Sequence, residues 1–355
     1  MKKHYYWLDL IRFLAAFMVV LSHLRGSSFV EFGMLPDSQK NIVTIIVYGL
    51  LRFGHEAVLV FFVMSGFLVG GKTLERTIAG TFNVKDYSID RAVRIMLPLM
   101  GALILIFISN FIMGNHNDYL QLVGNFFSLQ GILVGSASEP LWSLSYEVWF
   151  YILFGGICSF FTSEKDKRFW LLIILIISFI VFTKLDYIYL LLWIIGVIIY
   201  FYSPTKISKV KLSIYLILTF LCLIGLQLSS GSRSINIKFI GSILNRDILQ
   251  ILFALFFALS MMQIINIVPK KRIFIRIDKI GTKLALFSYT LYLTHFVFIR
   301  LFEYVGFPKS KLINLTSVSF FFLQLFICLI AAYLIYLLFE KHTDVVKKWI
   351  KSKIC

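Results

Sequence analysis

Charged residues are scarce in this chain of 355 residues: they make up 15% of it, whereas hydrophobic residues make up 59%. Long apolar runs recur along the whole length. This composition excludes a soluble fold and is typical of a polytopic membrane protein. Cysteine is also rare. The four cysteines, Cys158, Cys222, Cys328 and Cys355, have neither metal-ligand spacing nor the pattern of a disulfide framework, so no metal site is expected.

Several features of other protein classes are missing as well. The first apolar run, 7–24, contains Asp9 and Arg12 and lacks a signal-peptide cleavage site, so we interpret it as a retained helix. No internal repeat, low-complexity tract or soluble domain stands out in the sequence. We therefore expect a single integral-membrane domain over residues 1–355, without a soluble extracytoplasmic domain.

Apolar runs close to 20 residues long, the length that spans about 30 Å of hydrocarbon, occur about ten times. They predict an all-α bundle of transmembrane helices. The fifth and sixth runs are short and are joined at 184–186, where a re-entrant hairpin would serve the same topology. The predicted spans are 7–24, 54–71, 95–113, 141–162, 169–184, 187–203, 212–229, 248–268, 284–304 and 314–340.

Acidic residues are few, 18 against 35 basic ones, which gives a net charge of +17. The basic residues gather in alternate connections, above all 72–94 and 270–283. By the positive-inside rule this distribution places both termini in the cytoplasm, and it favours contact with anionic inner-leaflet lipid. The charge therefore needs no nucleic-acid partner, and the expected location is the inner (plasma) membrane.

Ionisable residues inside the first span lie on one face. Asp9, Arg12 and His23 fall within an arc of about 60° on a helix, which should face partner helices because charge in hydrocarbon is costly. An ion pair between Asp9 and Arg12 is an alternative to a functional role for these two residues. His23 would lie in the outer third of the membrane.

A carboxylate is expected at a similar depth. In PLWSLSYEVWFY (140–151) the helix enters from outside, so Glu147 lies about 9 Å below the outer boundary, against about 6 Å for His23. A carboxylate beside an imidazole orients it as a general base. The alternative is a structural His–Glu hydrogen bond without chemistry. Trp142 and Ser143 at the start of this helix are candidate substrate-binding residues.

Two further clusters complete the predicted site. Tyr292 and His295 share one face of the ninth span and are candidates for substrate binding, together with Asp9. Arg91 and Arg94, spaced i and i+3 at the start of the third span, are predicted to bind phosphate beside a helix N-terminus. Plain anchoring at the cytoplasmic surface is the alternative for these arginines.

Five segments in order resemble the integral-membrane acyltransferase 3 family, whose members move acetyl or other short acyl groups onto sugars and other acceptors of the cell surface. Each segment alone is weak evidence, but five in order are specific. They are WLDLIRFLAAFMVVLSH (7–23), VFFVMSGFLV (60–69), DRAVRIMLP (90–98), PLWSLSYEVWFY (140–151) and SYTLYLTH (288–295).

The resemblance implies roles for particular residues. His23 corresponds to the essential histidine, Glu147 to the acid of the W-S-L-x-x-E segment, and the two arginines of 91–94 to an R-x-x-R motif. Val148 and Trp149 stand where the family commonly has Glu and Gln, which puts more weight on Glu147. Many members also carry an extracytoplasmic hydrolase-like domain. None is expected here, so onward transfer would fall to this domain or to another protein.

The resulting hypothesis connects the two sides of the membrane. Acyl-CoA, with acetyl-CoA as the expected donor, binds with its phosphates near Arg91, Arg94 and Arg12 while its pantetheine arm extends inward to His23. There His23 either deprotonates a hydroxyl of a surface glycan acceptor or takes the acyl group itself. The competing class is a transporter or flippase, which would typically show repeat symmetry. A homo-oligomer stays open, because outward faces are apolar whether they touch lipid or another copy.

Overall fold

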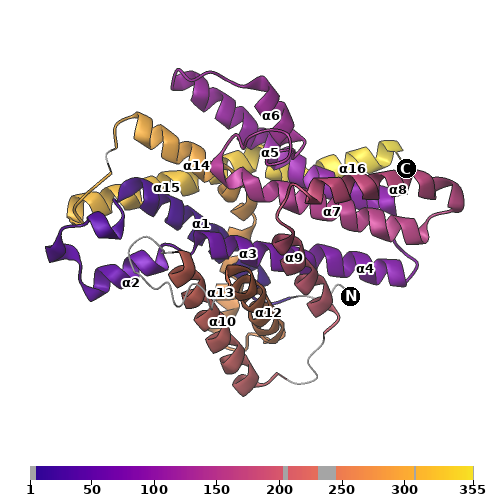
Figure 1. Cartoon of the computed structure of the whole chain (residues 1–355), viewed down its shortest axis with the longest axis horizontal. Coiled ribbons are helices and arrows are strands. Elements are labelled where there is room, and N and C mark those ends of the chain that lie inside the picture. Colours follow the sequence, from indigo (N-terminus) through magenta and orange to yellow (C-terminus); the bar gives the residue numbers. More distant parts are fainter. Residues whose placement is uncertain (1–4, 203–206, 231–244, 308, 355) are drawn as a thin grey trace.

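The protein is all-helical in a computed structural model that describes residues 5–202, 207–230, 245–307 and 309–354 (Figure 1). No β-strand occurs in these ranges. The helices are α1 (Leu8–Ser28), α2 (Ile42–Leu50), α3 (Gly54–Ser65), a π-helical segment η3 (Gly66–Gly71), α4 (Lys72–Ile78), α5 (Val84–Ile112), α6 (Tyr119–Phe126), η4 (Glu139–Leu141), α7 (Trp142–Thr162), α8 (Lys165–Phe182), α9 (Tyr187–Tyr200), α10 (Lys209–Ser230), α12 (Arg246–Ile264), α13 (Arg272–Ala285), α14 (Ser288–Tyr304), α15 (Leu315–Leu338), η5 (Glu340–His342) and α16 (Thr343–Ile354).

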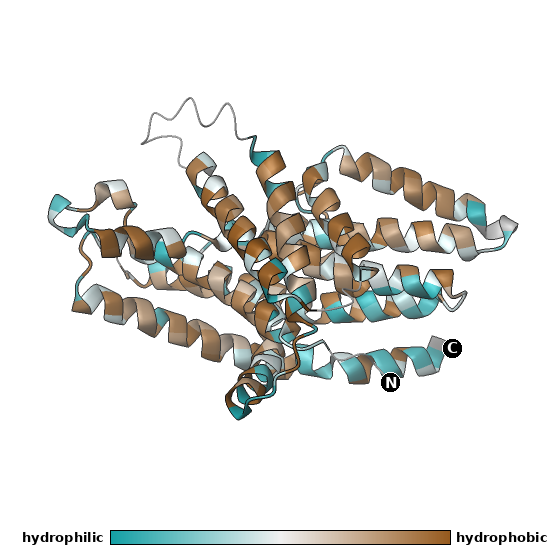
Figure 2. Cartoon of the chain, turned by 90° about the horizontal axis from the view of Figure 1, so that it is seen from below, coloured by the Kyte–Doolittle hydropathy of each residue, from teal (hydrophilic) through white to brown (hydrophobic). Residues whose placement is uncertain are grey.

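Six helical stretches in the described ranges are long and apolar enough to cross a membrane, or seven if α13 and α14, bent by 57° at their junction, count as one. The helices α8 and α9 are apolar but shorter. Hydrophobic residues cover most helical surfaces in Figure 2, while hydrophilic residues dominate the helix that ends at the C-terminus. The molecule is therefore a polytopic helix bundle. The sequence predicted about ten spans, which is more than the six or seven helical stretches that qualify by length and composition.

Two predicted span boundaries differ from the structure in an informative way. The span predicted to begin at residue 95 begins at Val84, because the Asn83 side chain caps the helix by accepting hydrogen bonds from the backbone N–H groups of Lys85 and Asp86. The span predicted over 54–71 continues through η3 into α4. Both extensions are polar, so hydrophobicity alone does not reveal them.

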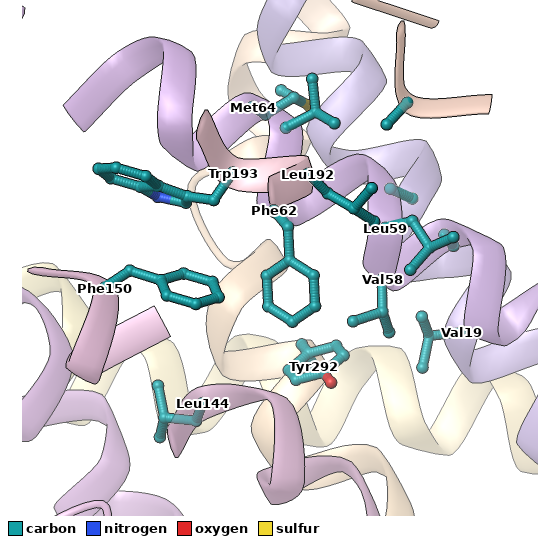
Figure 3. Close-up of a cluster of buried hydrophobic side chains, with 14 of the residues drawn as sticks. Val19, Val58, Leu59, Phe62, Met64, Leu144, Phe150, Leu192, Trp193 and Tyr292 are labelled. Atoms are coloured by element: carbon teal, nitrogen blue, oxygen red, sulfur yellow. The ribbon is translucent and has the colours of Figure 1, made fainter. Parts of the chain in front are cut away.

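The core is built around close helix contacts at glycines. The helix α1 packs against α3, α13, α14 and α15, and α3 packs against α9. A Cβ on Gly66 would lie 1.9 Å from the Trp193 carbonyl oxygen, and one on Gly196 would lie 2.1 Å from the Val63 carbonyl oxygen. Figure 3 shows the buried cluster that these contacts create, with Phe62 between Phe150 and Val58. Only glycine permits so close an approach of α3 and η3 to α9.

The helix α16 lies beside the first turns of α5 (Figure 1). Lys351 pairs with Asp86 at 2.5 Å and with Asp90 at 3.3 Å, and Lys347 lies 3.7 Å from Asp90. These ion pairs hold the C-terminal helix against the polar extension of α5. Lys2, Lys3, Arg233 and Lys238, which contribute to the predicted charge asymmetry, lie outside the described residues.

Candidate functional site

A cavity of about 480 Å³ lies where α1, α3, α4, α5, α7 and α14 meet. We call it the arginine cavity, because Arg12, Arg76, Arg91 and Arg94 line it. Three of these arginines were predicted from the sequence to bind a cofactor. The lining helices come from distant parts of the chain, so the fold gathers residues that the sequence keeps far apart.

The positive charge of this cavity is only partly compensated. Arg12 forms an ion pair with Asp9 at 3.3 Å, which is the predicted i, i+3 pair. Within the described ranges, Arg76, Arg91 and Arg94 have no ion-pair partner, and the Arg91 guanidinium lies 5.8 Å from the centre of the Tyr151 ring. Two carboxylates, Asp90 and Glu147, also line the cavity, but the arginines and Lys72 outnumber them. This excess of basic groups creates a positive potential suited to an anionic ligand.

The predicted helix N-terminus at the arginine pair is wrong. Because α5 begins at Val84, Arg91 and Arg94 lie well inside the helix, where each backbone N–H bonds to a carbonyl one turn earlier. An anion in the arginine cavity would therefore be held by side chains and not by free backbone donors.

Tyr292 and Ser143, both predicted as substrate-binding residues, are buried side chains that line the arginine cavity. Their hydroxyl oxygens are 2.6 Å apart, and the Tyr292 hydroxyl donates to the Pro140 carbonyl at 2.9 Å. The Tyr292 ring also contacts Phe61 at 5.7 Å between centroids. This set of contacts joins α14 to the start of α7. Neither His23 nor His295 lines the cavity.

Glu147 also lines the arginine cavity. It accepts a hydrogen bond from the Tyr151 hydroxyl, which lies 2.9 Å from the Ser65 hydroxyl, and Ser65 in turn accepts from the Trp193 indole at 3.2 Å. No hydrogen bond or ion pair joins Glu147 to His23 among the described residues, so the predicted direct pair is not formed. The two residues were predicted to lie at similar depths in the membrane, but similar depth on two helices does not bring their side chains into contact.

His23 lies instead beside a second histidine. Its ring centroid is 5.2 Å from that of His295, with the ring planes at 80°, and also 5.2 Å from that of Phe296. The His295 ring is 6.2 Å from the ring of Tyr292, which lines the arginine cavity, so a line of ring contacts leads from Tyr292 to His23.

The sequence matches a known family over nearly its whole length. The model of the acyltransferase 3 family, described as an acyltransferase domain, matches residues 5–349. The chain belongs to the acyltransferase 3 family. No curated protein and no solved structure gives a significant match.

Trp142 of this acyltransferase lies in an aromatic cluster outside the arginine cavity. It stacks on His55 at 6.0 Å with an interplanar angle of 13°, and contacts Tyr189 and Tyr146 at 5.5 and 5.7 Å. The predicted substrate-binding residues are therefore divided. Ser143 and Tyr292 line the cavity, the His295 ring contacts the Tyr292 ring, Asp9 pairs with Arg12, and Trp142 belongs to the separate aromatic cluster.

Sequence reasoning missed several residues that line the arginine cavity. Lys72, Thr73 and Arg76 of α4 line the arginine cavity, and Lys72 lies 5.7 Å from the centre of the Tyr5 ring. These residues belong to the basic segment 72–94, which served in the sequence analysis as evidence for the topology. Its residues were counted as anchoring charges, because nothing in the pattern shows that α4 continues the α3 span and turns toward α5. No group of three or more His, Cys, Asp or Glu side chains arranged to hold a metal occurs in the described ranges.

Proposed function

We propose that the protein is a membrane O-acetyltransferase that moves an acetyl or other short acyl group from cytoplasmic acyl-CoA to a hydroxyl of a cell-surface polysaccharide or its lipid-linked precursor. Family membership establishes acyl transfer in general terms. The observation that carries the specific proposal is the arginine cavity. Three guanidinium groups without an ion-pair partner among the described residues line it, and so does Tyr292, whose ring contacts His295 beside His23.

The donor suits the cavity by charge. The phosphates of acetyl-CoA bind to Arg76, Arg91 and Arg94, since guanidinium groups recognise phosphate through paired, charge-assisted hydrogen bonds. The pantetheine arm then points along the cavity toward Ser143 and Tyr292. The thioester reaches His23 when the Tyr292 side chain moves aside. Arg12, whose charge Asp9 already balances, borders this path.

The reaction takes place at His23. His23 accepts the proton of the acceptor hydroxyl as its oxygen attacks the thioester carbonyl, the carbon–sulfur bond breaks, and the proton passes to the departing CoA thiolate. In the second form of the reaction, the imidazole nitrogen attacks first and forms an acyl-histidine that the acceptor hydroxyl then cleaves. Glu147 serves on the donor side, where its bond from Tyr151 keeps a carboxylate among the arginines.

The proposed topology has about ten membrane passes, counting α1, the short α8 and α9, and both termini in the cytoplasm. The positive-inside distribution of Lys and Arg supports this orientation. It opens the arginine cavity to the cytoplasm, where acyl-CoA is made, and directs His23 and Glu139 to the outer side. The protein would then be a multi-pass component of the inner (plasma) membrane.

A kinetic comparison tests this proposal. Purified protein is given acetyl-CoA and surface glycan from otherwise identical cells that lack the protein, and CoA release is followed with a thiol reagent. Arg94→Gln should raise KM for acetyl-CoA about tenfold to a hundredfold, because one charge-assisted phosphate contact is lost. His23→Ala should abolish turnover while CoA still binds.

Arg272→Gln, which removes an exposed arginine of α13 outside the cavity, is the matched control. Unchanged turnover in His23→Ala, or equal KM in both arginine variants, would contradict the proposal.

A further inference from the structure

His295 is a fully buried histidine with a fixed proton. Its side chain is 0% exposed, and its Nδ1 lies 3.0 Å from the Leu291 carbonyl oxygen of the same helix. A carbonyl oxygen only accepts hydrogen bonds, so Nδ1 must carry the proton and donate it. The other ring nitrogen, Nε2, therefore presents a lone pair in the neutral imidazole.

That second nitrogen has no hydrogen-bond partner among the described residues, although it is buried. An unsatisfied buried acceptor is costly and is retained in few places in a folded protein. Two polar rings lie against His295, those of His23 and Tyr292. The Tyr292 hydroxyl is already bonded to Ser143 and Pro140. The imidazole of His23, whose ring contacts that of His295, is an N–H donor beside it.

We propose that His295 is the positioning residue of the reaction: during turnover its Nε2 accepts a hydrogen bond from a ring N–H of His23 and fixes the tautomer of that histidine. The opposite nitrogen of His23 is then free to receive the acceptor proton. This inference rests on the proposed function, and it assigns to His295 the task that the sequence assigned to Glu147. A neutral acceptor suits this place, because an unpaired carboxylate with no exposure would be far more costly to bury.

The proton count is simple. His23 takes the proton of the acceptor hydroxyl and becomes an imidazolium, whose bond to His295 is then charge-assisted and stronger than before. The proton leaves His23 for the CoA thiolate when the carbon–sulfur bond breaks. His295 neither gains nor loses a proton in the cycle. Its contribution is greatest when His23 is charged, so it should act on kcat more than on KM.

Two substitutions separate this role from a structural one. The amide of His295→Asn lies near the position of Nδ1, so it can donate to the Leu291 carbonyl but provides no acceptor where Nε2 stood. The amide of His295→Gln reaches the Nε2 position and keeps the acceptor there, while the Leu291 bond is lost. Acetyl-CoA turnover with surface glycan and the binding of CoA alone are measured for both variants at matched amounts of detergent-extracted, monodisperse protein.

We expect kcat to fall about tenfold or more in His295→Asn, with KM for acetyl-CoA little changed, and most of the activity to return in His295→Gln. The reverse order of the two variants would show that the Leu291 bond is what matters and would overturn the inference. A change confined to KM for the glycan would also overturn it, since His295 would then bind substrate directly. If both variants match the wild type, the inference fails while the proposed function stands. If the wild type binds no CoA and releases none, the proposed function fails and the inference falls with it.

Discussion

At the scale of single residues, Tyr292 divides the site into two parts. Its side chain lines the arginine cavity together with Ser143, and its ring lies against His295. Its hydroxyl donates to the Pro140 carbonyl, so the side chain ties α14 to the turn that precedes α7. In the proposed reaction Tyr292 acts as a closure, which the acyl group passes on its way from the arginines to His23.

Removal of the Tyr292 hydroxyl should loosen that closure. In Tyr292→Phe the bonds to Ser143 and Pro140 are lost while the ring remains, so water should reach the bound thioester more easily. We expect acceptor-independent release of CoA from acetyl-CoA to rise severalfold, measured without glycan. Tyr304→Phe, at the exposed end of the same helix, is the control and should leave this background rate unchanged. A background rate equal to that of the wild type in Tyr292→Phe would show that the tyrosine is not a closure.

The sequence could identify individual residues of the site where an energetic cost made them conspicuous. An ionisable side chain within a membrane span is costly to bury and is therefore a functional candidate. This criterion by itself singles out Arg12, Glu147 and His23. Arg76 carries the same charge and lines the same cavity, but it follows the predicted span 54–71 in a segment where basic residues are ordinary. Its role depends on the direction in which α4 runs, which is a tertiary property.

At the scale of helices, the close packing of α3 and η3 on α9 depends on two glycines. A Cβ on Gly196 would lie 2.1 Å from the Val63 carbonyl oxygen and 2.8 Å from the Phe67 backbone nitrogen, and neither backbone atom can give way as a flexible side chain can. These helices carry Ser65 and Trp193, which support Tyr151 and Glu147 at the arginine cavity. The contact therefore holds one wall of the site in place.

Gly196→Ala should force α9 away from α3. We expect it to lower the free energy of unfolding by about 1–3 kcal/mol, as overpacking of a tight core does, with a lower thermal midpoint in detergent. Gly49→Ala is a suitable control, because a Cβ on Gly49 of α2 would meet nothing within 4 Å. Equal midpoints for the two variants would contradict the packing argument.

Helix boundaries were predictable where apolar sequence and capping coincide. The helix predicted to begin at residue 141 begins at Trp142, directly after Pro140 and Leu141 of η4. The start of α5 was missed because Asn83 caps a polar stretch, and a polar stretch gives no hydrophobic signal. The π-helical segment η3 was not predicted either. Such segments are often found at functional sites, and this one leads directly into the cationic residues of α4.

At the scale of the whole molecule, the proposed orientation has a direct test. Cys158, Cys222 and Cys328 are buried, so they should react little with a thiol reagent. Once Cys355 is replaced by serine, labelling of a newly introduced surface cysteine can therefore be measured. His116→Cys, between α5 and α6, should react with a membrane-impermeant maleimide on intact cells. Lys270→Cys, before α13, is the counterpart and should react only after the membrane is opened. The opposite labelling pattern would reverse the topology and turn the arginine cavity away from cytoplasmic acyl-CoA.

The placement of helices beside one another was beyond the reach of the sequence. Rise per residue gave His23 and Glu147 similar depths, but α1 packs against α3, α13, α14 and α15. His23 therefore meets His295 of α14, while Glu147 on α7 faces the arginines. The depth of a residue in the membrane follows from its own helix, whereas its side-chain neighbours depend on how all the helices pack. Composition and charge were sufficient for the class of fold and for most of its helices.

The ion pairs between α16 and α5 bear on how this protein behaves outside the cell. Asp90 belongs both to the wall of the arginine cavity and to the pairs with Lys347 and Lys351. Because these groups are partly exposed, counterions at high ionic strength screen their attraction. A concentrated salt wash would loosen the C-terminal helix and leave Asp90 free to turn toward the neighbouring guanidinium groups. Apparent donor affinity then depends on the buffer as well as on the residues that touch the donor.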